Sequence, residues 1–340
     1  MKIAIVSFTR NGCALNRLLT DKLIGHECEG YGMEAYGKEF GLRSISPTLK
    51  DWTGRMFEEK EAVLFLGATG IAVRSITPFV KNKKTDPAVL VADEQGKFVI
   101  SLLSGHIGGA NRLTEEVAGI LGAIPVITTA TDVQGKFAVD VFAVKNHCQI
   151  MEMDLAKEVS ARIVDGKKVG FFTDFPVEGS IPEELMGSDS ELGICISLSD
   201  TKMPFQRTLH LIPQIITVGI GCKKNTEETK LETALKNVLD KADISVKAVV
   251  GMASIDLKAG EQGILSMAER YHWNFTTYSK EELLNAEGEF TPSDFVRGIT
   301  GVDNVCERSA VLQGGHLIWR KEAANGVTIA LAESDWRAVF

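Results

Sequence analysis

The chain has 340 residues, of which 44% are apolar and 24% are charged, so it is long enough for two or three domains and too apolar for a disordered protein. Its 37 basic and 45 acidic residues give a net charge of −8, which argues against a broad nucleic-acid-binding surface. Six scattered cysteines without a C-x-x-C pair, together with the absence of a long apolar stretch or a secretory signal in the sequence, predict a cytoplasmic protein that does not enter the membrane.

In chain order, short apolar runs alternate with glycine-containing loops and helical patterns, which predicts parallel sheets covered by helices. The first part is expected to contain strands at 2–7 and 61–66, a hairpin of 89–92 with 98–103, a strand at 124–128, a helix at about 13–24, and a second helix that follows Asn111 and ends at about 121.

The middle of the chain gives weaker signals: a helix at 152–163, strands at 168–172 and 192–198, and a surface loop at 175–190. The last part is expected to contain strands at 214–219, 246–251 and 275–278, helices at 227–240, 261–271 and 306–312, and a hairpin of 316–321 with 327–332. The predicted fold class is therefore multi-domain α/β, with mostly parallel open sheets, helices on both faces and a separate C-terminal α/β module. The predicted domains are 1–135, 136–212 and 213–340.

Glycine-rich loops follow several of the predicted strands, where parallel sheets usually bind ligands. Gly67-Ala68-Thr69-Gly70 could point backbone N–H groups at an oxygen-rich ligand, and Arg74 could pair with a carboxylate. The alternative is a plain tight turn followed by a surface arginine.

The segment from Ser104 to Asn111 follows the next predicted strand. His106 is the candidate general base, Ser104 a candidate binding hydroxyl, and Asn111 a candidate donor to an oxyanion. Asp132, at the end of a hydroxyl-rich strand exit, could orient His106 or act as a base itself. The alternatives are close helix packing at Gly108-Gly109 with Asn111 as a helix cap, and an Asx turn or helix cap at Asp132.

Cys222 lies before a predicted helix, where a thiol would have a lowered pKa and could act as a nucleophile. The alternative, a small buried side chain, is the more common role of a free cysteine. Lys223 and Lys224 next to it form a basic pair that could contact a polyanion.

Several longer runs together resemble the cobalt-precorrin-5A hydrolase family of anaerobic cobalamin biosynthesis. They are FLGATGIAVR at 65–74, DPAV at 86–89, SLLSGHIGGAN at 101–111, PVITTATD at 125–132, GIGC at 219–222, ASIDLK at 253–258 with Glu261, PS and FV at 292–296, and GVTIA at 326–330. The resemblance spans nearly the whole chain. It departs from the family after Cys306-Glu307, where Arg308-Ser309-Ala310 replaces proline and small residues.

The resemblance implies a hydrolase that opens the ring A acetate lactone of cobalt-precorrin-5A and releases acetaldehyde, giving cobalt-precorrin-5B. Cobalt would arrive inside the corrinoid substrate, so no protein cofactor or protein metal site is expected. An axial contact of His106 with that cobalt stays open. The resemblance also leaves open transient contact with methyltransferases of the pathway and assembly into a homo-oligomer.

Under this reading His106, Asp132 and Ser104 are the catalytic candidates. The substrate-binding candidates are Gly67, Ala68, Thr69, Gly70, Arg74, Gly108, Gly109, Asn111, Arg112, Thr129, Lys136, Gly221, Cys222, Lys223, Lys258 and Glu261. The arginines and lysines would pair with the acetate and propionate groups of the substrate. We expect the Gly67 turn, the His106 loop and the Cys222 turn to converge on one cleft.

Two other functions would share these features. A non-catalytic carrier of corrinoid intermediates would have the same loops but would release no acetaldehyde. A flavodoxin-like flavin protein is suggested by Ser7, Thr9, Asn11 and Gly12, although Cys13 and Ala14 replace the usual hydroxyl after the glycine.

Overall fold

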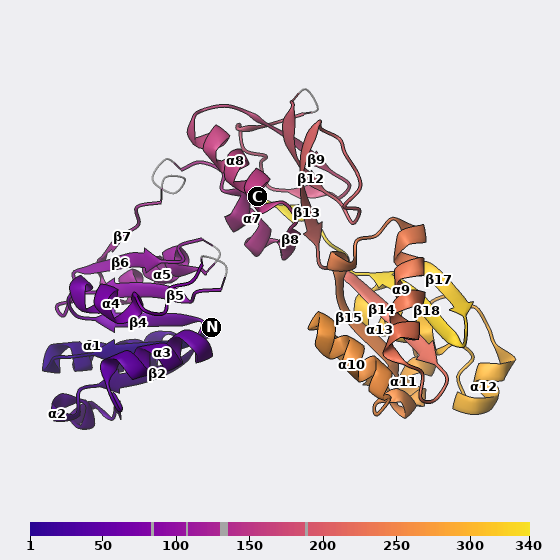
Figure 1. Cartoon of the computed structure of the whole chain (residues 1–340), viewed down its shortest axis with the longest axis horizontal. Coiled ribbons are helices and arrows are strands. Elements are labelled where there is room, and N and C mark those ends of the chain that lie inside the picture. The colour runs from indigo at the N-terminus through magenta and orange to yellow at the C-terminus, as the bar shows by residue number, and fades with distance from the viewer. Residues whose placement is uncertain (83–84, 107, 130–134, 188–189) are drawn as a thin grey trace. The chain divides into compact units, whose positions relative to one another are not determined.

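The computed structural model describes residues 1–82, 85–106, 108–129, 135–187 and 190–340 (Figure 1). The chain divides into two compact units, Met1–Val141 and Phe142–Phe340, which are described in turn. Within the described ranges, no helix is long and apolar enough to cross a membrane.

The first unit is built on a seven-stranded sheet with the order β3-β2-β1-β4-β5-β6-β7. Its strands are β1 (Lys2–Ser7), β2 (Glu27–Gly32), β3 (Arg43–Ser44), β4 (Ala62–Leu66), β5 (Ala88–Ala92), β6 (Phe98–Leu103) and β7 (Ile124–Val126). The first five strands in chain order are parallel, whereas β6 runs antiparallel to β5 and β7 runs parallel to β6.

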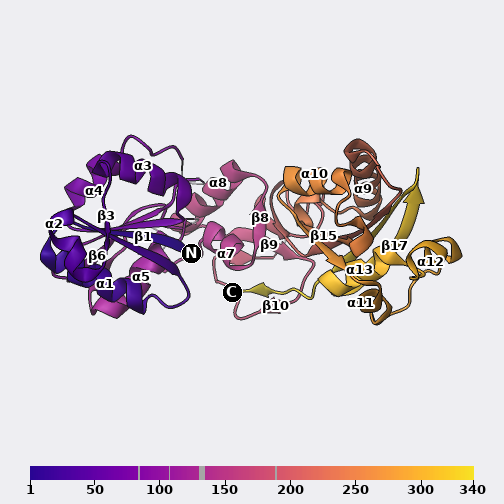
Figure 2. The ribbon, with the colours of Figure 1, turned by 90° about the horizontal axis from the view of Figure 1, so that it is seen from below.

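Helices cover both faces of this sheet (Figure 2). They are α1 (Arg10–Lys22), α2 (Glu34–Gly37), η1 (Lys38–Phe40), α3 (Leu49–Glu59), α4 (Thr69–Ile76) and α5 (Ala110–Leu121). Leu19 of α1 and Val117 of α5 are buried in one apolar cluster with the sheet, and Trp52 of α3 and Ile76 of α4 are buried in another. The central strands are apolar on both faces because both faces are covered.

The strand order reverses beside β1: the chain first adds β2 and β3 on one side and later adds β4 and β5 on the other. Because α1 and α4 cover opposite faces and begin directly after β1 and β4, their N-termini flank this reversal point. Open α/β sheets usually bind ligands there, outside the carboxyl ends of the strands.

Among the described residues, the second unit contains two five-stranded sheets and one two-stranded sheet. The first has the order β11-β9-β12-β13-β8, with all pairs parallel except β13 with β8. Its elements are α7 (Val139–Lys145, which begins in the first unit), β8 (Cys148–Ile150), α8 (Met153–Val164), β9 (Val169–Thr173), β11 (Leu185–Met186), β12 (Leu192–Ile196) and β13 (Arg207–Pro213).

The second sheet has the order β16-β15-β14-β18-β17. Its strands are β14 (Ile216–Cys222), β15 (Val249–Ile255), β16 (Asn274–Tyr278), β17 (His316–Ala324) and β18 (Val327–Glu333). The three strands β14 to β16 are parallel, and β18 joins β14 antiparallel. The connecting helices are α9 (Glu228–Ala242), η2 (Val246–Ala248), η3 (Asp256–Lys258), α10 (Gln262–Tyr271), α11 (Lys280–Leu284), α12 (Asp294–Thr300) and α13 (Val305–Gly314).

Side-chain alternation along β14 assigns these helices to opposite faces (Figure 2). Val218 and Ile220 are buried in one cluster with α9 and α10. Gly219, between them, faces α13, where an added Cβ would overlap the carbonyl oxygen of Cys306.

The end of the chain forms the two-stranded sheet of its unit, in which β19 (Ala338–Val339) pairs in parallel with β10 (Val177–Glu178). Phe340 packs on Phe142 and Phe171, with ring centroids 4.8 Å and 5.4 Å apart.

The predicted α/β class with mostly parallel sheets and helices on both faces is confirmed, as is the hairpin of β5 with β6. The predicted strand at 246–251 is wrong at its start, because 246–248 form η2 and β15 begins at Val249. The predicted loop at 175–190 contains the short strands β10 and β11. The elements between 27 and 59 were not predicted, and neither were α7, β8, β13, α11, α12 and β19. The division into three domains stays a prediction.

Candidate functional site

A cluster of polar side chains lies where β6 ends and α5 begins. Ser101 Oγ donates to Asn111 Oδ1 at 2.6 Å, and Asn111 Nδ2 donates to Thr129 Oγ1 at 3.0 Å. Asn111 is only 7% exposed, so its amide is fixed by these neighbours. An oxyanion at Asn111, as predicted, would therefore have to compete for the amide group with the two hydroxyl groups already bonded to it.

Ser104 begins the connecting loop in a left-handed backbone conformation, with φ of 58°, which is uncommon for serine. Its hydroxyl donates to the carbonyl oxygen of Asp86 at 3.0 Å. Gly108 must remain glycine here, because an added Cβ would come 2.8 Å from the carbonyl oxygen of Ser104. The backbone N–H of Gly109 donates to the His106 carbonyl at 2.9 Å, so this predicted oxyanion donor is occupied within the loop.

His106 pairs with a carboxylate that sequence reasoning missed. Its Nδ1 lies 3.0 Å from Oδ2 of Asp140, in the first turn of α7. The two side chains are 14% and 15% exposed. Burial raises the pKa of Asp140, but the hydrogen bond and charge of His106, together with backbone N–H groups, hold it below its ordinary value. The pair can therefore act as an oriented base.

Three of the four other residues predicted for this loop lie within the described ranges. Asp132, the predicted partner of His106, lies outside the described residues. Arg112 is exposed in the first turn of α5, and Lys136 is half-buried ahead of α7. Thr129 bonds to Asn111 as described above.

The Gly67 turn lies at the reversal point of strand order. Gly67 donates its N–H to the Ala92 carbonyl at 2.8 Å, so it extends the sheet and is not available as an oxyanion donor. Ala68 is the N-cap of α4, followed by Thr69 and Gly70 in its first turn. The guanidinium nitrogens of Arg74 lie 3.5 Å from the position that a Cβ of Gly70 would occupy. Arg74 thus brings a positive charge to the N-terminus of α4.

These two loops of the first unit do not converge as predicted. Val89 pairs with Leu103, so the end of β6 lies beside the start of β5, whereas Gly67 bonds to Ala92 at the end of β5. The physical reason is the antiparallel direction of β6, which carries the His106 loop to the edge opposite the Gly67 turn. The first unit therefore holds two separate candidate sites.

In the second unit, Lys258 and Glu261 bind each other, with Nζ and Oε2 3.0 Å apart and side chains 17% and 7% exposed. Burial raises the pKa of Glu261, but the hydrogen bond and charge of Lys258, with the N–H groups of Asn225 and Thr226, hold it below its ordinary value. Glu261 therefore fixes the loop that follows β14.

The predicted lowering of the Cys222 pKa is wrong. Burial raises the pKa of this thiol and outweighs the opposing charge of Lys258. Gly221 is explained by packing, since a Cβ there would come 2.5 Å from Thr328 Oγ1. Lys223 is exposed, and its N–H donates to the Gly326 carbonyl. This turn is held in place by protein contacts.

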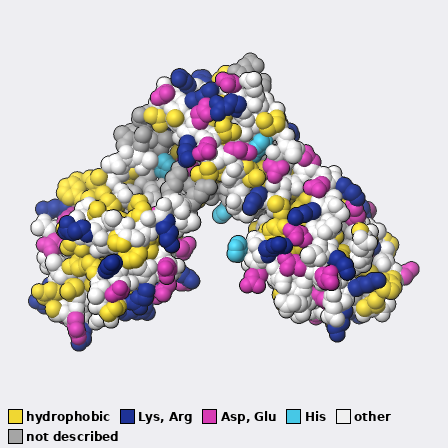
Figure 3. All heavy atoms as spheres, in the orientation of Figure 1, with side chains coloured by type: hydrophobic (Ala, Val, Ile, Leu, Met, Phe, Trp, Pro, Cys, Tyr) yellow, Lys and Arg dark blue, Asp and Glu magenta, His cyan; other side chains and the backbone are white. Residues whose placement is uncertain are grey.

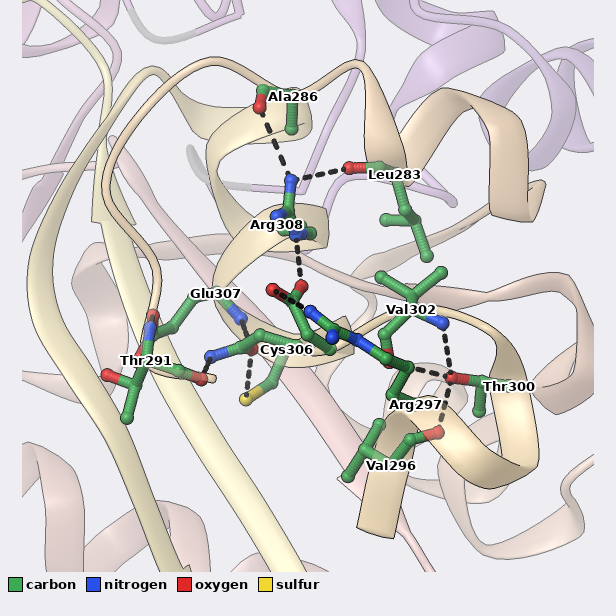
Figure 4. Close-up of polar contacts among 12 residues, drawn as sticks. Leu283, Ala286, Thr291, Val296, Arg297, Thr300, Val302, Cys306, Glu307 and Arg308 are labelled. Carbon is green, nitrogen blue, oxygen red and sulfur yellow. Dashed lines mark hydrogen bonds and ion pairs between the residues drawn. The ribbon is translucent and has the colours of Figure 1, made fainter. Parts of the chain in front are cut away.

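Arg308, where the sequence departs from the family pattern, makes contacts that hold neighbouring segments of the protein together (Figure 4). Its guanidinium pairs with Asp303 at 2.9 Å and donates to the carbonyls of Leu283 and Ala286 at the end of α11. The neighbouring Glu307 is fully buried and accepts the backbone N–H groups of Thr291 at 2.7 Å and Lys321 at 2.6 Å.

On the face seen in Figure 3, basic and acidic side chains are interspersed on each unit. Among the described residues, no group of three or more His, Cys, Asp or Glu side chains is placed to hold a metal ion.

Three family descriptions match the chain in order. They are "Cobalamin synthesis G N-terminal" over residues 51–132, "Cobalamin biosynthesis central region" over 137–213, and "Cobalamin synthesis G C-terminus" over 216–332. The cobalt-precorrin-5A hydrolase of Priestia megaterium is 33% identical over 98% of this chain and 95% of its own length. The cobalt-precorrin-5A hydrolase of Salmonella typhimurium is 39% identical over 81% of this chain and 82% of its own length.

Proposed function

This chain belongs to the cobalt-precorrin-5A hydrolase family, and we propose that it carries out the reaction for which that family is named. The substrate is a cobalt-containing corrinoid with a lactone on its ring A acetate. Water opens that lactone. The bond between the macrocycle and the extruded meso carbon then breaks, its electron pair stays on the macrocycle, and that carbon leaves with its methyl group as acetaldehyde. The cobalt belongs to the substrate in this proposal and not to the protein.

The His106–Asp140 pair at the start of α5 is the observation that supports a reaction site in the first unit. Because Nδ1 faces Asp140, we assign Nε2 of His106 as the atom that takes a proton from water. The hydroxide oxygen then bonds to the lactone carbonyl carbon, and the ring C–O bond breaks. The proton held on Nε2 then passes to the departing oxygen, which becomes a hydroxyl group.

The N-terminus of α5 supplies positive potential beside this base. The developing oxyanion would be stabilised by the partial charge of the helix and by the N–H of Gly108, which is the remaining predicted donor of the Gly-Gly pair. Arg112 lies in the same first turn and is exposed, so it can pair with a carboxylate of the substrate. Ser104 and Asn111 hold the loop that carries His106.

The Gly67 turn is a separate candidate site of the first unit, so Arg74 beside Gly70 is not assigned a contact with a substrate bound at His106. The Cys222 turn belongs to the second unit, where Lys258 is paired with Glu261 and Lys223 is exposed. This proposal therefore assigns neither turn to the reaction site.

The test compares the wild-type protein with His106→Ala, using acetaldehyde release and the mass of the corrinoid product. Removing a general base should lower kcat by about 10²- to 10⁴-fold while the circular dichroism spectrum is unchanged. A wild-type rate in the variant would overturn the base assignment. Substrate binding without acetaldehyde in the wild-type protein would overturn the activity and favour a carrier.

A further inference from the structure

We propose that Asp140 is the positioning residue of His106, orienting its imidazole and setting its tautomer through Nδ1. This inference rests on the proposed function, because it concerns the same base. It assigns the role to a carboxylate on α7, a helix that sequence reasoning did not predict.

The contact that carries the proposal is direct. Nδ1 of His106 lies 3.0 Å from Oδ2 of Asp140, although the two residues are separated by 34 positions in the chain. Both side chains are about 15% exposed, so water competes only weakly for the bond. A carboxylate at this distance accepts a hydrogen bond from the Nδ1–H group, and it thereby favours the neutral tautomer in which Nε2 carries no proton.

Asp140 is itself held from a second side. Its Oδ1 accepts the backbone N–H of Val141 at 3.1 Å, at the N-terminal turn of α7. The partial positive charge of a helix N-terminus favours a carboxylate in that turn. The pKa of Asp140 is below its ordinary value despite burial, so the group is ionised near neutral pH. One oxygen thus anchors the carboxylate to α7 while the other orients the imidazole.

A carboxylate bound to a base in this way acts through orientation and tautomer, and its loss lowers turnover without removing the substrate contacts. The change to test is Asp140→Asn, which keeps the size of the side chain. An asparagine can donate its amide N–H to Nδ1, which would place the ring proton on Nε2 and block it as a base. We expect kcat to fall by about 10- to 100-fold with KM within about twofold of wild type.

Two further variants separate positioning from a general structural effect. Asp140→Glu restores a carboxylate and should recover part of the lost kcat. Glu116→Gln is the matched control, because Glu116 contacts His26 Nε2 at 3.2 Å in the same unit but has no place in the proposed site. It should leave kcat unchanged.

Nitrogen-15 NMR of the labelled imidazole gives a readout that does not depend on substrate. In the wild-type protein the neutral ring of His106 should carry its proton on Nδ1, and in Asp140→Asn it should carry it on Nε2. This measurement also works if the variant loses stability, because it can be made at low temperature on the folded fraction.

The outcomes distinguish the two proposals. If His106→Ala is inactive but Asp140→Asn keeps the wild-type kcat and tautomer, the positioning role is wrong and the proposed function stands. If Asp132→Asn reproduces the loss while Asp140→Asn does not, the role belongs to Asp132. If His106→Ala turns over normally, the base assignment fails and the positioning role fails with it.

Discussion

Ser104 adopts a backbone conformation that costs an L-amino acid about 1 kcal/mol, at the start of the loop that carries His106. Glycine would avoid that cost. The serine hydroxyl bonds to the Asp86 carbonyl at 3.0 Å, which ties the loop to the residue just ahead of β5. Since strained residues concentrate at functional sites, this conformation supports the choice of the 104–111 loop as the reaction site.

Glu29 lies in the first unit among partners that favour its ionised form. Its carboxylate accepts a hydrogen bond from Tyr31 at 2.6 Å and pairs with Arg43 at 2.7 Å and Lys60 at 2.9 Å. The Tyr31 hydrogen bond, opposed by burial and aided by Lys60 and Arg43, lowers its pKa to about 2. The stabilisation is therefore complete when the pH is above about 4.3, the pKa of a glutamate in an unfolded chain. It is lost as the pH falls toward 2, the pKa of Glu29 in the folded protein.

We expect Glu29→Gln to lower the free energy of unfolding by about 1 kcal/mol at pH 7. This is less than the pKa shift alone would give, because Glu29 and Arg43 are partly exposed and water screens their charges. Urea unfolding at several pH values checks this, and the difference between variant and wild type should disappear near pH 2. Glu59→Gln, an exposed change on α3, is the control. A difference that persists unchanged at pH 2 would show that packing, and not charge, explains the effect.

Residue types and spacing make His106, Ser104 and Asn111 candidates for the site, but they do not point to Asp140. Asp140 lies in a segment without a motif, and its role depends on where α7 begins relative to a loop 34 positions earlier. The predicted lowering of the Cys222 pKa was wrong for a related reason. The place of this cysteine before a helix predicts a lowered pKa, but burial by the surrounding strands and loops, which a sequence does not show, raises it.

At the scale of elements, the close contact of α13 with β14 depends on Gly219, which has no side chain. Val218 and Ile220 face α9 and α10, while Gly219 lets the backbone of α13 approach the other face of the strand. The GIGC motif thus has a packing reason at its first glycine.

Gly219→Ala should lower the stability of the second unit by about 3 kcal/mol, because the new methyl group would overlap the Cys306 carbonyl and displace α13. Thermal unfolding measures the change. Gly298→Ala, in α12 of the same unit, is the matched control, since an added Cβ there meets no heavy atom within 4 Å. That control should be neutral or stabilising by up to about 1 kcal/mol. Equal stability of both variants would refute the close contact.

Strongly apolar strands and amphipathic helices could be predicted as elements, and their α/β order followed from them. The missed strand β2 has the sequence ECEGYG, with little apolar character, because most of its residues are only partly buried. The strand β13 was missed because its start, Arg207-Thr208, is polar and gives no apolar signal. The opposite placement of the His106 loop and the Gly67 turn could have been read from the predicted hairpin, since a hairpin reverses the strand direction.

At the scale of the whole molecule, the second unit is closed by its own C-terminus. Asn146 on the segment after α7 is buried, and its side chain binds both backbone groups of Val339: Nδ2 donates to the carbonyl at 3.0 Å, and Oδ1 accepts the N–H at 2.8 Å. Trp336 Nε1 donates to the Asn146 carbonyl at 3.1 Å. A residue near the beginning of the unit therefore fixes a strand near its end.

Asn146→Ala tests this closure, because it leaves the Val339 N–H and carbonyl without their side-chain partners. Each buried group left unpaired costs about 1–3 kcal/mol, so we expect a loss of about 2–4 kcal/mol in the stability of the second unit. Hydrogen exchange at the Val339 amide should accelerate by at least about 10-fold, because β19 would then be held mainly by its short pairing with β10. Lys145→Ala, an exposed change at the adjacent position, should leave both quantities unchanged. Normal protection of Val339 in Asn146→Ala would mean that the aromatic packing of Phe340 on Phe142 and Phe171 holds the end of the chain by itself.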